Sequence, residues 1–382
     1  MFRDFIGYVI KIVLKGVLHF FYLFSVEENK ITLLNELSYT YGDSLKYIDQ
    51  YIHSQRKGMY KIVFPIKKGV KLTEYPDDVI VTPNTFRYFK ELITSRVIIT
   101  NAGGVSYLPK RKGQTIISTW HGGGPYKKTS TDVYESFWYR MQAKMNANNT
   151  DYILSSCKFF SKFEAKSMGY EQKKIIPVGL PRNDIIFKNH ENIKKKVKEF
   201  YSIHEDVKFI LFAPTFRGDF INVYDIENYV RLDIDKIIDT LEVKFGHKWI
   251  LGIRLHPKLS NVDMSKLNVI NCTTYPDMQE LLCAADGVIS DYSSLIWDYS
   301  FTYNPIFLYA PDIEEYEKER GFYMPIEEWP FPIAHNNDEM LDNIRMFSLE
   351  EYVENVKEHH IASGSYETGM ACQKVLELIE CT

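Results

Sequence analysis

Short apolar runs alternate with helical repeats along most of the chain. The runs predict strands, in a first series at 61–64, 79–82, 96–100, 115–120, 151–155 and 175–178, and in a second at 207–213, 248–254, 269–272, 287–290 and 305–309. Between them, the spacing of apolar residues predicts helices at 43–55, 132–147, 158–168, 192–201, 235–245, 277–284 and 293–301.

This alternation predicts an α/β fold with two Rossmann-like, doubly wound domains in series. We expect the first domain at residues 26–190, a linker near 188–206, the second domain at 205–350, and C-terminal helices at 351–382 that pack back across the domains. Ligands of open α/β sheets bind at the carboxyl ends of the strands. The two domains are therefore expected to face each other across a cleft, with the functional motifs just after strands.

The amino-terminal stretch 5–24 is long and apolar, but its polar residues are regularly spaced. Lys11, Lys15 and His19 recur at every fourth residue, so on a helix they form one polar stripe. We expect residues 1–25 to form an amphipathic helix that lies in a membrane interface. The alternatives are a helix packed on the protein's own core and a tilted single span. No small-residue cleavage site precedes Glu27, which argues against a secretory signal.

Composition narrows the class of protein. Of the 382 residues, 45% are hydrophobic and 25% are charged, which is typical of a folded globular chain. The formal net charge of -4 excludes a globally basic surface, so we expect no nucleic-acid partner. Five cysteines without a C-x-x-C pair suggest neither a disulfide framework nor a thiolate zinc site, and they fit a reducing cytosol.

A glycine-rich segment follows the predicted strand at 115–120 and contains His121, Gly122, Gly123, Gly124, Lys127 and Lys128. The three glycines permit a backbone path that other residues would strain, and their N–H groups and the two lysines suit an anion. The imidazole of His121 titrates near neutral pH and can take a proton from a hydroxyl group. The alternative is a flexible loop with a structural histidine.

Three polar motifs follow strands of the second series, with the residues Thr215, Arg217, Arg254, His256, Asp291, Ser293 and Ser294. Arginine suits a phosphate because it donates two parallel hydrogen bonds. Positions 254 and 256 alternate on a strand that Pro257 ends, so both side chains would reach one bound anion. Ser293 or Ser294 can cap a helix whose N-terminal N–H groups suit a pyrophosphate. The alternatives are a surface arginine, a polar strand edge and a helix cap without a ligand.

Other polar clusters have simpler interpretations. Asp233 and Asp235 resemble the D-x-D motif of metal-dependent sugar transferases, but they open a helical repeat and predict an N-cap. His359 and His360 lie in a charged helical stretch and are expected at the surface. No Asp/Glu/His cluster has convincing metal-ligand spacing, so we expect no tightly held metal and no cofactor.

Taken in order, the motifs resemble the CDP-glycerol glycerophosphotransferase family of teichoic acid and capsule enzymes. The resemblance is carried by Tyr39–Asp43, Trp120–Gly122 with Lys127 and Lys128, Gly179–Asp184, Ala213–Thr215, Arg254–Pro257 and Asp291–Ser294. It implies a GT-B-like fold and transfer of a polyol phosphate, glycerol phosphate first, from a CDP-linked donor to a lipid-linked or glycan acceptor, with release of CMP. The family's motif histidines match His121, the base, and His256, at the donor diphosphate. Gly123-Gly124 makes the first loop one residue longer than the WHGTP of polymerase-like members.

The resemblance also assigns tasks to the parts of the chain. It implies an acceptor-side domain at 26–190, with the 122–128 loop, and a CDP-donor domain at 205–350, with Thr215, Arg217, Arg254, Asp291, Ser293 and Ser294 on the donor phosphates. It places the protein at the cytoplasmic face of the membrane as a peripheral protein. Two other functions stay open at this point, a GT-B sugar transferase that uses a nucleotide sugar, and a non-catalytic, membrane-attached binding module.

Overall fold

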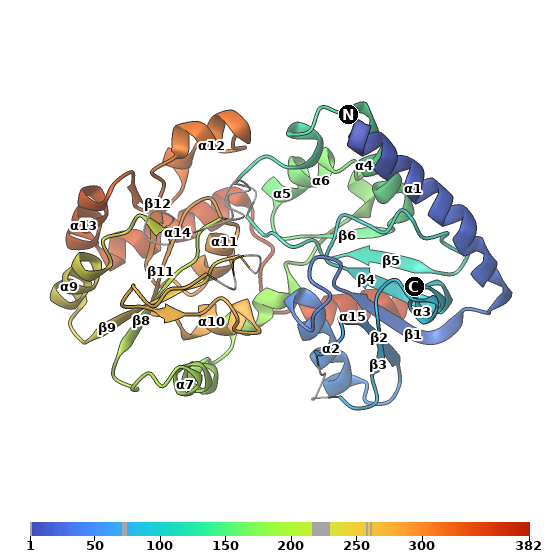
Figure 1. Cartoon of the computed structure of the whole chain (residues 1–382), viewed down its shortest axis with the longest axis horizontal. Coiled ribbons are helices and arrows are strands. Elements are labelled where there is room, and N and C mark those ends of the chain that lie inside the picture. Colours follow the sequence, from blue (N-terminus) through green and yellow to red (C-terminus); the bar gives the residue numbers. More distant parts are fainter. Residues whose placement is uncertain (1, 71–74, 125, 216–229, 257–258, 260–261) are drawn as a thin grey trace. The chain divides into compact units, whose positions relative to one another are not determined.

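The computed structural model describes residues 2–70, 75–124, 126–215, 230–256, 259 and 262–382 (Figure 1). The chain divides into two compact units. The first unit contains residues 1–184 and returns at the end of the chain with residues 364–382. The second unit contains residues 185–363.

The first unit is built on a seven-stranded parallel sheet, with the order β3-β2-β1-β4-β5-β6-β7. Its strands are β1 (Glu27–Leu34), β2 (Lys61–Pro65), β3 (Val79–Val81), β4 (Ser95–Thr100), β5 (Thr115–Ser118), β6 (Tyr152–Ser155) and β7 (Ile175–Pro177). Its α-helices are α1 (Phe2–Leu18), α2 (Asp43–Gln55), α3 (Phe86–Thr94), α4 (Phe137–Asn149), α5 (Lys158–Lys162), α6 (Glu164–Ser167) and α15 (Ala371–Cys381). Short 3-10 helices are η1 (His19–Leu23), η2 (Ser130–Asp132), η3 (Gln172–Lys174) and η4 (Pro181–Phe187), the last of which runs into the second unit.

Both faces of this sheet are covered. Ile31 and Leu33 of β1 pack with α2 and with Val375 and Ile379 of α15. The neighbouring Leu34 points to the opposite face and joins a cluster with α3 and η1. Side chains of successive strand residues alternate between faces, so each strand contributes to both cores.

The second unit repeats the design with six parallel strands in the order β10-β9-β8-β11-β12-β13. The strands are β8 (Lys208–Phe212), β9 (Trp249–Ile253), β10 (Ile270–Asn271), β11 (Gly287–Ser290), β12 (Ile306–Tyr309) and β13 (Ile333–Ala334). The helices are α7 (Glu191–Phe200), α9 (Ile234–Phe245), α10 (Met278–Ala284), α11 (Leu295–Ser300), α12 (Ile313–Glu319), η6 (Ile326–Glu328), α13 (Asn337–Met346) and α14 (Leu349–Ser363).

The predicted α/β class with two doubly wound sheets is confirmed. In each unit the first strand lies in the middle, and the chain winds to one side and then to the other, as in a Rossmann fold. The order reverses between β1 and β4 in the first unit and between β8 and β11 in the second. In open α/β sheets, ligands bind outside the carboxyl ends of the strands at this reversal. The two reversals therefore mark where a site is expected in each unit.

One central strand was missed by the sequence analysis. Strand β1 begins with the polar residues Glu27 to Lys30, which lack the apolar run of the other strands. Lys30 is nevertheless fully buried, and its Nζ donates to Glu91 Oε2 at 2.8 Å and to the Thr94 hydroxyl at 2.5 Å. A buried ammonium group is tolerated when it is paired and hydrogen-bonded. Lys30 can lie in a buried strand because Glu91 of α3 pairs with it, and the sequence around Lys30 does not reveal this distant partner.

Helix α1 is amphipathic as predicted, and its apolar side faces outward. Lys11 and Lys15 are half-buried against the first unit, while Val13 and Val17 are exposed, Val17 by 65%. The helix packs beside α4, where Phe5 contacts the Trp138 ring at 4.7 Å (Figure 1). Residues Phe2–Leu23 are long and apolar enough to cross a membrane, and only 11% of their apolar window is buried. A core helix is therefore excluded for most of this segment.

Two smaller expectations have opposite outcomes. Asp233 caps α9 as predicted, since its side chain accepts the Lys236 N–H. The surface position predicted for His359 and His360 is wrong, because both lie on the buried side of α14. His360 stacks on the Phe301 ring at 4.1 Å and lies 2.7 Å from the Ser300 hydroxyl.

Candidate functional site

The first site lies beyond β5 in the first unit. The strand ends at Ser118, and Trp120 then takes a φ of 56°, which turns the chain sharply before His121. A bulky residue in the left-handed region is strained, and such strain is concentrated at functional sites. Trp120 therefore makes the turn before the glycines, and the anion-binding role of Gly122, Gly123 and Gly124 stays a prediction.

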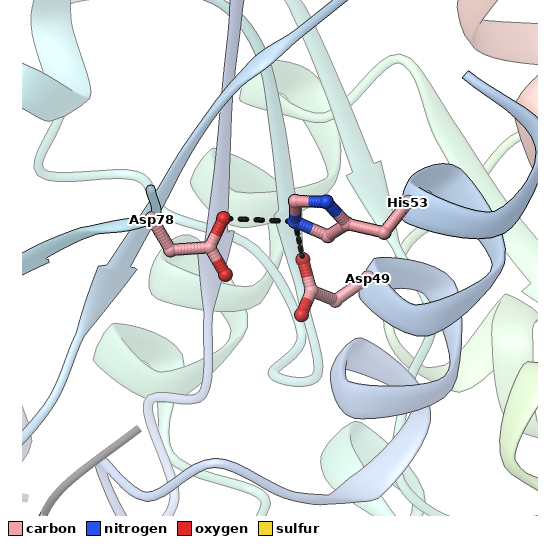
Figure 2. A group of neighbouring side chains, drawn as sticks. All are labelled: Asp49, His53 and Asp78. Atoms are coloured by element: carbon pink, nitrogen blue, oxygen red, sulfur yellow. Dashed lines mark hydrogen bonds and ion pairs between the residues drawn. The ribbon is translucent and has the colours of Figure 1, made fainter. Parts of the chain in front are cut away.

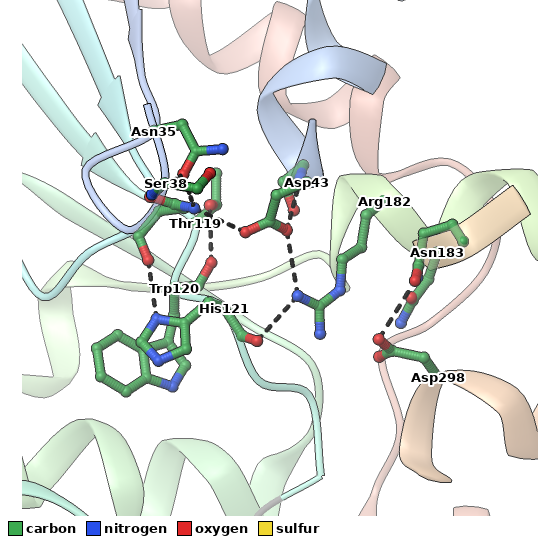
Figure 3. A network of polar contacts seen from close by, with 12 residues as sticks. Asn35, Ser38, Asp43, Thr119, Trp120, His121, Arg182, Asn183 and Asp298 are labelled. Carbon is green, nitrogen blue, oxygen red and sulfur yellow. Dashed lines mark hydrogen bonds and ion pairs between the residues drawn. The ribbon is translucent and has the colours of Figure 1, made fainter. Parts of the chain in front are cut away.

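The imidazole of His121 is held in one tautomer. Its Nδ1 lies 3.0 Å from the carbonyl oxygen of Asn101, directly after β4. A carbonyl oxygen can only accept, so the hydrogen is on Nδ1 and the basic lone pair is on Nε2. The Trp120 ring lies 3.9 Å from the imidazole (Figure 3). His121 is thus oriented as a histidine that takes up a proton at Nε2.

A buried polar network surrounds this histidine (Figure 3). The Asn101 amide nitrogen donates to Asp43 Oδ2 at 2.8 Å and to Asn35 Oδ1 at 2.9 Å. The Arg182 guanidinium donates to Asp43 Oδ1 at 3.1 Å and to the carbonyl of His121 at 2.8 Å. Asn35 and Asn101 directly follow β1 and β4, the strands at the order reversal. The network therefore occupies the predicted location in a doubly wound sheet.

Electrostatics of the network keep His121 neutral. Burial lowers the pKa of His121 below its ordinary value, against the Asn101 carbonyl and the Asp43 carboxylate, which raise it. Arg182 and Lys127 lower the pKa of His121 further. Burial by itself would raise the pKa of Asp43, but Arg182 and the Asn101 amide outweigh it and lower this pKa. A neutral imidazole beside an ionised carboxylate is the arrangement that a general base needs.

The segment 179–184 fixes Arg182 from the other side. Gly179 has a φ of +85°, and a Cβ there would lie 2.6 Å from Glu367 Oε2. Glu367 in turn accepts the Leu180 N–H at 3.1 Å. Asp184 accepts the N–H groups of Ala371 and Cys372 at 2.9 and 2.7 Å, at the start of α15. The C-terminal segment of the chain thus anchors the residues on both sides of Arg182.

In the second unit, the polar residues gather at the reversal between β8 and β11. Asp291 directly follows β11 and is buried. Its carboxylate accepts the Thr215 N–H at 2.9 Å and the Thr215 hydroxyl at 2.6 Å. Thr215 follows β8, so this contact joins the ends of the two strands. Two of the motifs singled out in the sequence thus lie side by side, and their role in donor binding stays a prediction.

Helix α11 starts close to this contact in the chain, but it is short. It begins at Leu295, with Ser294 at the N-cap position and no hydrogen bond from the Ser294 side chain. The Ser293 hydroxyl lies 3.5 Å from the Leu295 nitrogen. The cap from Ser294 expected as one of two options is therefore absent, and Ser293 makes only a long contact.

Arg254 and His256 come directly after β9, which ends at Ile253, one residue short of the predicted strand. The Arg254 guanidinium donates to the carbonyls of Tyr275 at 2.8 Å and Cys272 at 3.2 Å. His256 is exposed. Arg217 and Pro257 lie outside the described residues, and the phosphate-binding roles of Arg217, Arg254 and His256 stay predictions.

Three residues of the first site had no assigned role in the sequence analysis: Asp43, Asn101 and Arg182. Asp43 and Arg182 lie in motifs that carry the family resemblance, and this was the sequence signal that could have identified them as site residues. Asn101 follows a predicted strand, and its role becomes clear only from the contacts of its backbone carbonyl with His121 and of its side-chain amide with Asp43.

Lys127 and Lys128, which follow the glycines, are half-buried.

Comparison with known proteins gives one consistent result. The profile of the family CDP-Glycerol:Poly(glycerophosphate) glycerophosphotransferase matches residues 17–381. A teichoic acid poly(glycerol phosphate) polymerase of Staphylococcus epidermidis is 27% identical over 89% of this chain and 48% of its own length, so this chain spans about half of that relative. A polymerase of the same description from Bacillus spizizenii is 26% identical over 83% of each chain.

A solved structure adds the fold. The structure is of the wall teichoic acid polymerase TagF, a variant with one histidine replaced by asparagine, soaked with CDPG. It matches 100% of this chain and 97% of its own with a TM-score of 0.82 at 24% identity. This likeness confirms the expected GT-B-like architecture of two Rossmann-like sheets.

Proposed function

Because this chain belongs to the CDP-glycerol:poly(glycerophosphate) glycerophosphotransferase family, we propose that it transfers glycerol phosphate from CDP-glycerol to an acceptor hydroxyl. The acceptor is a lipid-linked glycan or polymer, and CMP is released. The observation that carries the proposal is the single tautomer of His121, which leaves Nε2 as the basic nitrogen of a ring whose protonated form the Asp43 carboxylate favours.

The proposed reaction needs one base and one binding site for phosphate. The acceptor oxygen attacks the β-phosphorus of CDP-glycerol, its proton passes to His121 Nε2, and the bond from this phosphorus to the bridging oxygen breaks as CMP leaves. Asp43 stabilises the imidazolium that forms. Asn101 holds the opposite nitrogen, so the ring keeps its orientation during the transfer.

The second unit is proposed to bind the donor. Thr215 and Asp291 join the strand ends where nucleotides bind in doubly wound folds. Ser293, Ser294 and the following N–H groups, with Arg217, Arg254 and His256, are the proposed contacts of the diphosphate. In the first unit, Gly122 to Gly124 with Lys127 and Lys128 are proposed to border the acceptor.

We also propose that the protein binds the cytoplasmic face of the membrane through α1. Soluble proteins turn the apolar side of a surface helix toward the core. Here the apolar side is the outer one: Phe2, Ile10, Val13, Val17 and Leu23 are exposed. Phe137, at the start of the neighbouring helix α4, is exposed as well. A lipid bilayer covers such a face without a cost for exposed apolar area.

A donor panel tests the reaction. The full chain is incubated with CDP-glycerol, CDP-ribitol or UDP-sugars, with membrane extract as the source of acceptor, and the released nucleotide is identified. We expect CMP from CDP-glycerol, dependent on the extract. UMP or UDP from a UDP-sugar would instead establish a sugar transferase. Nucleotide binding without release from any donor would establish a binding module.

Fractionation tests the membrane role. We expect the full chain to sediment with anionic lipid vesicles and to be released by carbonate. The double variant Val13→Glu/Val17→Glu should lose most of this binding, because two charges enter the apolar face. The matched control Lys11→Gln/Lys15→Gln changes the opposite side of α1 and should bind nearly as the wild type. Resistance to carbonate would show a true span, and binding by the Val13/Val17 variant would exclude this face.

A further inference from the structure

A second polar cluster lies in the first unit, away from His121. Asp49 and His53 are one helical turn apart on α2, and Asp78 comes directly before β3 (Figure 2). The His53 Nε2 lies 2.9 Å from Asp78 Oδ1 and 3.5 Å from Asp49 Oδ1. One ligand atom from each of the three residues lies within 4.8 Å of the others. The proposed transfer reaction uses none of these residues.

These separations suit three side chains that bind directly to one metal ion. Ligand atoms at 2.0–2.2 Å from a tetrahedral Zn²⁺ are about 3.3–3.6 Å from one another. The contact of His53 with Asp49 matches this separation and its contact with Asp78 is shorter, so a small shift of Asp78 would admit an ion. Figure 2 shows both carboxylates directed at the same edge of the imidazole ring. An imidazole with two carboxylates is a donor set that Zn²⁺ and Mn²⁺ accept.

The side chains of the cluster are largely buried. The side chain of Asp49 is fully buried, that of Asp78 is 2% exposed, and that of His53 is 15% exposed. The other oxygen of Asp78, Oδ2, is buried and has no hydrogen-bond partner. Buried carboxylates of this kind are stable when they are paired or bind a cation.

Neighbouring side chains already orient two of the three residues. The Tyr41 hydroxyl donates to Asp49 Oδ2 at 2.8 Å, which leaves Oδ1 toward His53. The Tyr75 ring stacks on the imidazole at 3.9 Å with an interplanar angle of 2°. Partners of this kind fix ligand orientation in metal sites and tune affinity by about 10- to 100-fold.

From this geometry we propose that Asp49, His53 and Asp78 bind one divalent transition-metal ion, Zn²⁺ first, with the remaining positions taken by water. The ion joins α2 to the segment before β3. Helix α2 begins at Asp43, so the ion would hold the element that supplies the carboxylate of the His121 network. No metal was predicted from the sequence, because Asp78 is distant in the chain from the i, i+4 pair Asp49 and His53.

Metal titration of the full chain in mild detergent tests the proposal. After removal of metal with a chelator, Zn²⁺ is added and binding is measured by competition with a chromogenic indicator. We expect one ion per chain and a higher melting temperature with Zn²⁺. His53→Asn and Asp78→Asn should each weaken binding at least about tenfold and remove the shift. The control His335→Asn changes an exposed histidine in an i, i+4 pair with Glu339 and should bind as the wild type.

Two further measurements keep the test decisive. Tyr41→Phe removes only the hydroxyl that holds Asp49 and should weaken binding by about tenfold in a folded protein, even if the ligand variants unfold. Co²⁺ should give the absorption of a four- to five-coordinate site with oxygen and nitrogen ligands. Wild-type binding in all three variants, no binding at all, or a thiolate charge-transfer band from a cysteine site would each overturn the proposal.

Discussion

Two regions of the molecule contain histidines with lowered pKa values, and the neighbours of these histidines differ. His121 in the first unit is surrounded by a carboxylate, a guanidinium and a backbone carbonyl. His359 and His360 in the second unit pack among aromatic rings, with Trp297 5.5 Å from the His360 ring. Burial lowers the pKa of His359 and of His360 to about 4, and it lowers the pKa of His121 as well.

The difference shows that a lowered pKa alone does not identify a reactive histidine, because the neighbouring groups decide what the ring can do. At His121 the Asp43 carboxylate stabilises the protonated ring, and the Asn101 carbonyl fixes its tautomer. At His360 the Ser300 hydroxyl and the stacked Phe301 hold the ring, and the neighbouring His359 opposes its protonation. The first arrangement suits proton transfer, whereas the second stabilises the fold.

The largest expected effect is on catalysis at His121. His121→Ala should reduce the rate of CMP release by at least about 100-fold, the usual share of a general base, with little change in the affinity for CDP-glycerol. The control His204→Ala, at an exposed histidine, should keep the wild-type rate. Near-normal turnover of the His121→Ala enzyme would contradict the role of His121 as the base and its distinction from His359 and His360.

Acid should destabilise the fold through the histidines that pack among aromatic rings, His359 and His360. An imidazole that titrates near 4 in the folded state and near 6.5 in the unfolded state favours unfolding as the pH falls below 6.5. Between pH 7 and pH 5 this costs about 2 kcal/mol in the free energy of unfolding. His360→Gln should reduce this loss, and the exposed control His335→Gln should not. Urea denaturation at both pH values measures it, and equal losses in all three proteins would contradict the assignment.

Asp43→Asn should have an intermediate effect on the first region. Asparagine tolerates the φ of 56° at this position, so the backbone should be kept. Loss of the charge lowers the pKa of His121 further and destabilises the imidazolium, so turnover should fall about tenfold. The neutral form is the active one, and the acid limb of the pH–rate profile should therefore move to lower pH. A shift to higher pH would contradict the role of Asp43.

The smallest effect is expected from Lys127→Gln. The positive charge of Lys127 lowers the pKa of His121 and is the smallest of the effects on it, so removal of this charge should raise the pKa slightly. The acid limb should move to higher pH, opposite to the shift in Asp43→Asn. Parallel pH–rate profiles of the two variants measure both signs in one experiment. Shifts in the same direction would show that the limb does not report His121.

Local pattern alone determined the class of fold and most of its strands. Apolar runs predicted all but two of the observed strands, because strands of parallel sheets are buried on both faces. The exceptions are β1, whose first half is charged, and β13, which has only two residues. The sequence also predicted that His121, Thr215 and Asp291 follow strands, where the ligand-binding residues of parallel sheets lie.

The tertiary structure decided what local pattern does not contain. Amphipathicity predicted α1, but only packing against α4 decided that Lys11 and Lys15 face the protein and Val13 and Val17 face outward. Asp43 and Arg182 meet at His121 from distant parts of the chain, as Asp78 meets His53. The pKa of a buried group depends on its spatial neighbours, so the roles of His121 and of His359 with His360 could be told apart only in the folded chain.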